Sequence, residues 1–358
     1  MTEIDTSAPV LVTGATGYVA GWIVKRLLEA GATVHAAVRE PANGARRVHL
    51  DEAAAAAPGS IRYFKADLIE EGSYSEAMRG CSIVFHTASP FITEVTDAED
   101  QLIEPALLGT RNVLGEAARA PSVRRVVVTS SCAAMYSDAA DCAKGPGGML
   151  TEDVWNTTAS PDYQPYSYSK TIAEKEAWRI AEGQAQFRLV TVNPSLVMGP
   201  AIGGRPTSES FALIDRAGRG EFKRGVPRFG IGIVDVRDVA DGHIAAAFRE
   251  NARGRHILSG HDTTLFDSLT TLLPAFGDRY PLPRRATPKW LVWLIAPRVD
   301  LTRRFVARNA DVPWRADNTK SIRELGMTYR PLAETMVDMF RYMIEQGYFE
   351  PGRNGRRA

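Results

Sequence analysis

A tyrosine and a lysine stand four residues apart in the segment PYSYSKTIAEKEAW, residues 165–178. Pro165 suits the first position of a helix, where its missing N–H is not needed, and good helix formers follow it. On that helix Tyr166 shares a face with Lys170, whereas Tyr168 points to the other side. A positive charge beside a phenol favours the phenolate and eases proton transfer. Tyr166 and Lys170 are therefore candidates for a proton-transfer site, although the spacing alone is also that of a surface lysine beside an interfacial tyrosine.

A glycine-rich turn follows the first apolar run of the chain, in VTGATGYVAGWIV at residues 12–24. Gly14 and Gly17, with Ala20 in the third position of the pattern, fall where a predicted strand ends and a predicted helix begins. Glycine permits the tight bend, and N–H groups at a helix N-terminus can bind a pyrophosphate. This strand–turn–helix context predicts a dinucleotide site.

Arginines follow the second predicted strand, which ends in Arg39, with Arg46 and Arg47 a short loop later. NAD sites usually have an acidic residue at this strand end to hold the ribose hydroxyls. A guanidinium instead matches a 2′-phosphate in charge and shape. Glu40 is expected to point outward. The pattern favours NADP (NADPH), with Arg39 and Arg47 as candidate ligands.

Short β-branched runs alternate with helix-like stretches over residues 9–200. The stretch 19–30 places Ile23, Leu27 and Leu28 on one side, as an amphipathic helix does. Several strands are apolar on both faces, as a parallel sheet buried on both sides requires. The alternation predicts an α/β doubly wound parallel sheet (Rossmann) with a smaller C-terminal substrate-binding domain. The predicted strands are 10–13, 33–39, 61–66, 83–87, 125–130 and 189–192.

The chain is expected to divide near residue 200. Residues 1–200 would form the dinucleotide-binding domain and 201–358 mainly the substrate-binding domain, with 225–260 returning to the sheet. Bulky side chains after residue 200 suggest a pocket for a hydrophobic ketone or aldehyde at the domain junction. The apolar run 290–296 is too short to span a bilayer and is expected to be a buried helix or a pocket wall.

Composition and charge exclude several classes of protein. The 358 residues are 44% hydrophobic with a net charge of +1, which argues against a nucleic-acid or membrane partner. The N-terminus has no secretory pattern, so a cytoplasmic protein is expected. The three cysteines form neither a disulfide framework nor a metal-site spacing, and no metal is expected. The expected partner is a small carbonyl or alcohol substrate, and the expected state is a monomer or homodimer.

Several motifs occur in the order and spacing of one known family. They are TGATGYVAGWIV, ADL at 66–68, VFHTASP at 84–90, VVVTSS at 126–131, YSYSK at 166–170 and NPSLVMGP at 193–200. Together they resemble the extended short-chain dehydrogenase/reductases. TEDVW at 151–155 and VDVRDVADGHIAAA at 234–247 are similar to the branch of plant dihydroflavonol and cinnamoyl-CoA reductases and fungal carbonyl (methylglyoxal) reductases. The likeness covers nearly the whole chain.

The resemblance implies roles for residues at matching positions. Tyr166 would be the general acid, Lys170 would assist it and hold the nicotinamide ribose, and Ser131 would hold the substrate carbonyl oxygen, with Ser130 as the fallback. The implied NADP-binding residues, besides Tyr166, Lys170 and the two arginines, are Gly14, Ala15, Thr16, Gly17, Tyr18, Val19, Asp67, Leu68, Thr87, Ala88, Ser89, Thr129, Pro194, Val197 and Ser208.

The resemblance implies an NADPH-dependent carbonyl reductase, reversible as an alcohol dehydrogenase, with a Ser-Tyr-Lys site. Two alternatives stay open: an epimerase, dehydratase or 3β-hydroxysteroid-type dehydrogenase on the same scaffold, and a non-catalytic NADP-sensing protein. Cinnamoyl-CoA reductases share an Asn-Trp-Tyr-Cys-Tyr-Gly-Lys signature, whereas this chain has QPYSYSK at 164–170. That departure counts against a CoA thioester as the substrate.

Overall fold

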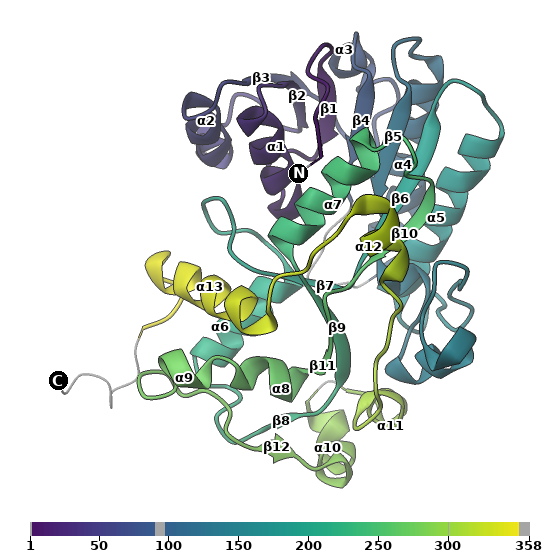
Figure 1. The fold of residues 1–358 in the computed structure, drawn as a ribbon. Helices are drawn as coiled ribbons and strands as arrows, with labels where there is room; N and C mark the ends of the chain where they lie inside the picture. The colour runs from purple at the N-terminus through teal and green to yellow at the C-terminus, as the bar shows by residue number, and fades with distance from the viewer. Residues whose placement is uncertain (1, 90–96, 300, 351–358) are drawn as a thin grey trace.

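A seven-stranded parallel sheet forms the centre of the protein (Figure 1). A computed structural model describes residues 2–89, 97–299 and 301–350. The strand order is β10-β6-β5-β4-β1-β2-β3. The strands are β1 Val10–Thr13, β2 Thr33–Val38, β3 Ser60–Lys65, β4 Ile83–His86, β5 Arg125–Thr129, β6 Arg188–Pro194 and β10 Gly254–Leu258. The six strands predicted from the sequence are all present, each within two residues at either end.

Helices cover both faces of this sheet, which confirms the predicted doubly wound fold. They are α1 Tyr18–Glu29, α2 Val48–Ala55, α3 Ser75–Met78, α4 Glu104–Arg119, α5 Pro165–Glu182 and α7 Val236–Phe248. One apolar core includes residues of α1 and α7, and the other includes residues of α3 and α4. Strand order reverses between β1 and β4, and ligands of such sheets bind at that point, at the carboxyl ends of the strands.

Short helical turns occur in the loops between these elements. They are η1 Gly44–Arg46, η2 Glu99–Ile103, η3 Cys132–Ala134, η4 Ala139–Lys144 and η5 Pro146–Gly148. The last three lie between β5 and α5, in the segment that joins Ser131 to Tyr166. This segment has no long helix or strand, so its shape depends on side-chain contacts with the rest of the protein.

The C-terminal part forms a smaller lobe beside the carboxyl edge of the sheet (Figure 1). Its strands are β7 Leu196–Met198, β9 Gly230–Asp235 and β11 His261–Thr264 in one sheet, and β8 Val226–Pro227 with β12 Ala286–Thr287 in another. Its helices are α6 Glu209–Gly218, α8 Leu265–Thr270, α9 Leu273–Phe276, α10 Lys289–Ile295, η6 Ala296–Arg298, α11 Arg303–Asn309 and α13 Leu332–Glu345. Helix α12 Thr319–Leu325 lies against the parallel sheet instead, where Lys320 Nζ donates to the Arg255 carbonyl oxygen of β10 at 2.8 Å (Figure 1). An aromatic and methionine-rich core includes residues of α6 and α13.

The run 290–296 does not lie as expected from the sequence. Val292 and Ala296 are buried, but Trp290 is 68% exposed and Trp293 is 42% exposed. The apolar run therefore forms a surface helix, α10, with only one face buried.

Candidate active site

Helix α5 presents Tyr166 and Lys170 on one face. The helix begins at Pro165, as predicted, and the preceding Gln164 has a left-handed backbone (φ 58°). The Lys170 ammonium nitrogen lies 5.7 Å from the centre of the Tyr166 ring. Tyr166 is 46% exposed, so a ligand can reach its side chain. Tyr168, two residues further along the helix, is half-buried. The local geometry is that of the predicted pair.

Lys170 connects this helix to the edge of the sheet. Its Nζ donates to Ser89 Oγ at 2.9 Å, in the segment that follows β4. His86, at the end of β4, is buried, and burial together with the nearby Lys170 charge lowers its pKa to about 3. His86 is therefore neutral at physiological pH and adds no second charge beside Lys170.

Ser130 and Ser131 directly follow β5 and have different surroundings. Ser130 is buried, and its Oγ donates to Glu174 Oε2 at 2.6 Å. Ser131 is half-buried, and its Oγ accepts from the Ala133 N–H at 3.1 Å, a contact that does not use the hydroxyl proton. Ser131 is therefore better placed than Ser130 to donate to a substrate oxygen.

Glu174 lies one turn after Lys170 on α5 and is 1% exposed. Each of its side-chain partners donates to it: Ser130 Oγ, Thr191 Oγ1 at 3.0 Å, Asn193 Nδ2 at 2.8 Å, Trp178 Nε1 at 3.4 Å and Arg255 Nε at 2.7 Å. A buried carboxylate is stable when several donors and a counter-ion surround it. We call Glu174, Ser130, Thr191, Asn193 and Arg255 the Glu174 hub.

The hub reaches both Ser131 and the TEDVW motif. Asn193 Nδ2 also donates to the Ser131 carbonyl oxygen at 3.2 Å. Arg255 donates to the Val154 carbonyl oxygen at 2.6 Å, and its guanidinium lies 3.9 Å from the Trp155 ring centre. Sequence reasoning missed Glu174, although the spacing of Tyr166, Lys170 and Glu174 puts all three on one helical face.

The turn between β1 and α1 fits a pyrophosphate. Gly14 has φ +62°, and a Cβ there would lie 3.1 Å from Ala88 Cα. Gly17 is the N-cap of α1 and offers no side chain to cap the first-turn N–H groups. A backbone that must approach closely, with donors at a helix N-terminus, is suited to the diphosphate of a dinucleotide.

A cleft of about 910 Å³ extends from this turn along the carboxyl edge of the sheet. Ten residues predicted to bind NADP line it: Gly14, Thr16, Gly17, Tyr18, Arg39, Asp67, Leu68, Thr87, Ala88 and Ser89. Thr129 and Lys170 line a smaller adjoining pocket, which shares Leu68, Ala88 and Ser89 with the cleft. The structure thus brings together most of the residues predicted for the cofactor.

The arginines after β2 are not placed as expected. Arg47 lies outside the cleft lining, since it donates to the Pro41 carbonyl oxygen at 2.8 Å and stacks on the Tyr63 ring at 4.6 Å. Arg46 lines the cleft instead, together with Arg39. A loop turn decides which of two neighbouring arginines faces the cleft, and the sequence pattern does not encode that turn.

Tyr166, Ser131 and five further predicted residues also lie outside the lining of both pockets. Ser208 is the N-cap of α6, where its Oγ accepts from the Phe211 N–H at 3.4 Å. Pro194 ends β6 and is buried, and Val197 is half-buried in β7. Ala15 is buried and Val19 is half-buried in the first turn of α1.

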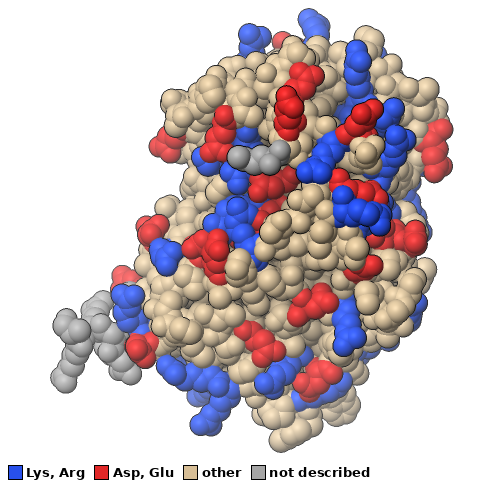
Figure 2. All heavy atoms as spheres, viewed as in Figure 1, with Lys and Arg blue, Asp and Glu red and all other residues tan. Residues whose placement is uncertain are grey.

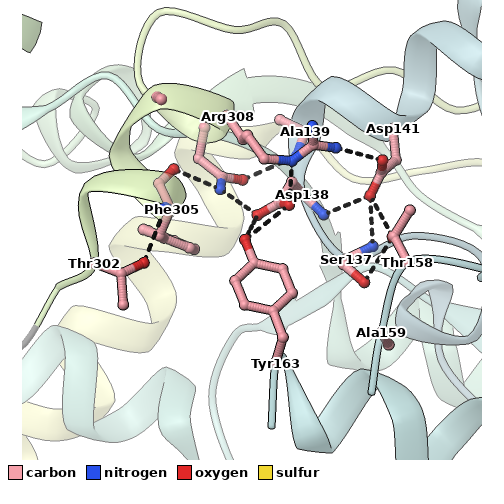
Figure 3. Close-up of polar contacts among 12 residues, drawn as sticks. Ser137, Asp138, Ala139, Asp141, Thr158, Ala159, Tyr163, Thr302, Phe305 and Arg308 are labelled. Atoms are coloured by element: carbon pink, nitrogen blue, oxygen red, sulfur yellow. Dashed lines mark hydrogen bonds and ion pairs between the residues drawn. The ribbon is translucent and has the colours of Figure 1, made fainter.

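A second polar cluster precedes Tyr166 (Figure 3). Asp138, which is fully buried, accepts from Tyr163 Oη at 2.9 Å, Arg308 Nε at 2.6 Å and Asn309 Nδ2 at 2.7 Å. Asp141 accepts from Arg308 Nη2 at 2.6 Å. We call these five residues the Asp138 latch, because it joins α11 of the small lobe to the segment between Ser131 and Tyr166.

Known proteins with similar sequences are reductases. The NAD dependent epimerase/dehydratase family matches residues 10–260. The chain is similar to cinnamoyl-CoA reductase CAD2 of Medicago truncatula, with 38% identity over 72% of this chain and 78% of that protein. It is also similar to tetraketide alpha-pyrone reductase 1 of Arabidopsis thaliana, with 35% identity over 95% of this chain and 96% of that protein.

The fold is also similar to that of a solved reductase. The structure of yeast methylglyoxal/isovaleraldehyde reductase Gre2 complexed with NADPH has a TM-score of 0.76 to this chain and 28% identity. The similarity covers 95% of this chain and 100% of that one. It therefore extends over the small lobe as well as the parallel sheet.

Proposed function

The chain belongs to the NAD dependent epimerase/dehydratase family, and we propose that it is an NADPH-dependent carbonyl reductase that converts a ketone or aldehyde reversibly to an alcohol. As an extended short-chain dehydrogenase/reductase related to named reductases, it is an NADP-dependent oxidoreductase acting on a small molecule. The observation that carries the finer proposal is the Tyr166–Lys170 face of α5, joined to the rim of the dinucleotide cleft by the bond from Lys170 to Ser89.

The residues of the cleft fit a dinucleotide phosphate. Gly14 and Gly17 would face the pyrophosphate, and Asp67 and Leu68 the adenine side. Arg39 and Arg46 would hold the 2′-phosphate, which distinguishes NADPH from NADH. When bound, NADPH supplies the hydride that is added to the carbonyl carbon.

Three side chains would act on the carbonyl oxygen. Ser131 and Tyr166 would donate hydrogen bonds to it, which stabilises negative charge as it develops in the transition state. Tyr166 would then transfer its proton to the alkoxide. Lys170 would favour the phenolate left on Tyr166, and its bond to Ser89 would hold the ammonium in place.

Glu174 would act as a positioning residue. It lines the inner part of the smaller pocket beside Lys170, where its carboxylate is taken up by protein donors. It fixes Ser130 directly and Ser131 through Asn193, and it belongs to the same helix as Tyr166. A shift of about 1 Å between reacting groups can cost about 10²-fold in rate. The hub would therefore set the distance between the Ser131 and Tyr166 hydroxyls.

The family name leaves an epimerase or dehydratase as the second candidate. Such an enzyme retains its nicotinamide cofactor through turnover, so NAD that purifies with the protein would favour it. The relative from Medicago truncatula is a cinnamoyl-CoA reductase, but QPYSYSK lacks the signature of that group, so we propose a ketone or aldehyde rather than a thioester.

The test is NADPH and NADH oxidation by the wild type and by Tyr166→Phe with ketones, aldehydes, aldose-like compounds and a CoA thioester. We expect turnover with NADPH, and a loss of about 10³-fold in kcat in Tyr166→Phe with NADPH binding retained. Tyr168→Phe is the matched control and should keep its activity. Absence of turnover by the wild type, despite NADPH binding, would overturn the reductase proposal in favour of the epimerase or a sensor.

The cofactor preference has its own test. Arg39→Ala and Arg46→Ala should each lower kcat/KM with NADPH by about 10-fold or more and leave kcat/KM with NADH unchanged. Arg188→Ala, at an exposed position at the start of β6, is the control. Equal losses of kcat/KM with both cofactors would show that these arginines do not bind the 2′-phosphate.

A further inference from the structure

Helix α10 has apolar side chains on both of its faces. Its sequence, KWLVWLI, has one polar residue. Val292 and Ala296 pack inward in a small core with Val306 and Ala310. A helix that is apolar on all sides is normally buried on all sides. The outward face of α10 therefore lacks the cover that its composition calls for.

The outward face is a concentrated apolar patch. Trp290, Trp293 and Leu294 have the spacing of one helical face. Val299, the first residue after η6, is 49% exposed. Leu294 is 52% exposed. In the described part of the chain, four of the eight exposed large apolar side chains fall within these ten residues. Patches of this kind mark binding surfaces.

Positive charge flanks this patch in the sequence, and the Arg303 guanidinium lies 4.3 Å from the centre of the Trp293 ring. Residues 284–304 contain six Lys or Arg and one Asp, a net charge of +5, so the rest of the chain carries +1 − 5 = −4. Exposed arginines flank the helix on both sides in the sequence, and none forms an ion pair among the described residues; they are Arg284, Arg285, Arg298, Arg303 and Arg304. The net charge of the whole chain, +1, does not reveal this basic segment.

We propose that α10 binds the surface of an anionic lipid bilayer, with Trp290, Trp293 and Leu294 inserted between headgroups. Trp and Leu on one side with Lys and Arg around them are typical of helices that lie in the membrane interface. Anionic headgroups attract such clusters of arginine. A second copy of the same face would instead bring two +5 segments together, which opposes a symmetric dimer through α10.

The position of α10 in the molecule permits this contact. No helix in the described ranges is long and apolar enough to cross a membrane, so α10 would lie on the bilayer rather than span it. Figure 1 places α10 at the tip of the small lobe, away from the parallel sheet, and Figure 2 shows uncharged surface at that tip. A bilayer could therefore contact α10 without touching the dinucleotide-binding half of the protein.

The test is co-sedimentation of the full chain with vesicles of phosphatidylcholine alone or mixed with phosphatidylserine. We expect binding to the mixed vesicles at least about tenfold stronger than to phosphatidylcholine, weakening as salt is added. Trp290→Ser/Leu294→Ser and Arg298→Glu/Arg303→Glu should each lower that binding about tenfold or more. Both variants should keep reductase activity, which reports folding independently of lipid.

Two control variants distinguish binding through α10 from non-specific binding of the protein to vesicles. Ile322→Ser removes an exposed apolar side chain on α12, and Arg188→Glu changes an exposed charge on β6; neither should alter vesicle binding. Failure of the wild type to bind mixed vesicles would overturn the proposal. So would self-association in sedimentation velocity that Trp290→Ser/Leu294→Ser abolishes, because the partner would then be a second copy of this chain.

Discussion

The Glu174 hub and the Asp138 latch both hold the segment between β5 and α5, and they differ in what they join it to. The hub joins α5 to strands β5, β6 and β10 within the parallel sheet. The latch joins the loop after Ser131 to α11 of the small lobe. Both place a carboxylate with no exposed surface against an arginine, but Arg255 is 7% exposed and Arg308 is 31% exposed.

This difference has an energetic consequence. An uncompensated charge costs several kcal/mol in a site that excludes water and much less where water can reach it. Loss of a partner in the hub should therefore cost more than the equivalent loss in the latch. The hub would set the catalytic geometry, and the latch would set how the small lobe sits on it.

The largest effect is expected for Glu174→Gln. The new side-chain amide nitrogen would face groups that themselves donate hydrogen bonds, and Arg255 would lose its counter-ion. The free energy of unfolding should therefore fall by about 3–5 kcal/mol. Because Ser131 and Tyr166 lose alignment, kcat of the folded protein should fall about 10²-fold with little change in NADPH binding. Urea unfolding, and kcat measured with NADPH and 4-deuterated NADPH, would check both; hydride transfer should become more rate-limiting.

A double variant separates stability from alignment. Glu174→Gln/Arg255→Met leaves no unpaired charge, so most of the lost stability should return while kcat stays low. Glu324→Gln is the control, since Glu324 pairs with His256, the next residue on β10. Wild-type kcat in the double variant would show that Glu174 stabilises the fold without positioning the site.

Asp138→Asn should have a smaller effect. The substitution removes the negative charge that pairs with Arg308, but water can partly solvate the Arg308 guanidinium. We therefore expect the free energy of unfolding to fall by about 1–3 kcal/mol. Since the latch joins the two lobes, KM for the carbonyl substrate should rise more than kcat falls. Steady-state kinetics beside urea unfolding would test this, and a kcat loss as large as in Glu174→Gln would remove the distinction between the two clusters.

Asp141 should make the latch sensitive to acid. Burial raises the pKa of this carboxyl, but hydrogen bonds from Lys144, Thr158 and two backbone N–H groups outweigh burial and bring the pKa below its usual value. The stabilisation is present above the ordinary Asp pKa of about 3.9 and is lost as the pH falls through the lowered pKa. Asp141→Asn should cost about 1 kcal/mol at pH 7 and progressively less below pH about 4. Urea unfolding across this range would measure the difference, and a cost that does not depend on pH would contradict the assignment.

The smallest effect, with the opposite sign, is expected beside the hub. Burial is the largest influence on Glu152 and raises its pKa, although its Oε1 accepts from the Ile257 N–H at 3.0 Å. Ionisation therefore penalises the folded state, and stability is lost as the pH rises from the ordinary Glu pKa to the raised one. Glu152→Gln keeps an acceptor and should be neutral or stabilising by less than about 1 kcal/mol at pH 7. A clear loss of stability at pH 7, but not at pH 4, would contradict this.

The parts predicted from sequence depend on neighbours in the chain. Helix α5, its start at Pro165 and the shared face of Tyr166 and Lys170 follow from local spacing. The glycine turn and the strand ends follow from residue types within a few positions. These patterns predicted the fold class and the part of the cleft formed by Gly14, Gly17 and Arg39, whereas the family resemblance supplied Asp67, Leu68 and residues 87–89.

The parts that sequence reasoning missed depend on contacts across long separations. The partners of Glu174 are 44 residues earlier at Ser130 and 81 residues later at Arg255, and no local pattern joins them. The choice of Arg46 over Arg47 depends on a loop turn and on Tyr63. Ser208 could have been identified as a helix cap, because it directly precedes α6 and accepts from a backbone N–H in its first turn.

The separation of Glu174 from Arg255 also orders events during synthesis. Glu174 leaves the ribosome 81 residues before its counter-ion, a delay of roughly 4–16 s at 5–20 residues per second. Until β10 adds to the edge of the sheet, α5 carries a carboxylate that cannot be buried without penalty. Helix α5 therefore cannot pack fully against the sheet early, and the last parallel strand to be made completes both the sheet and the Glu174 hub.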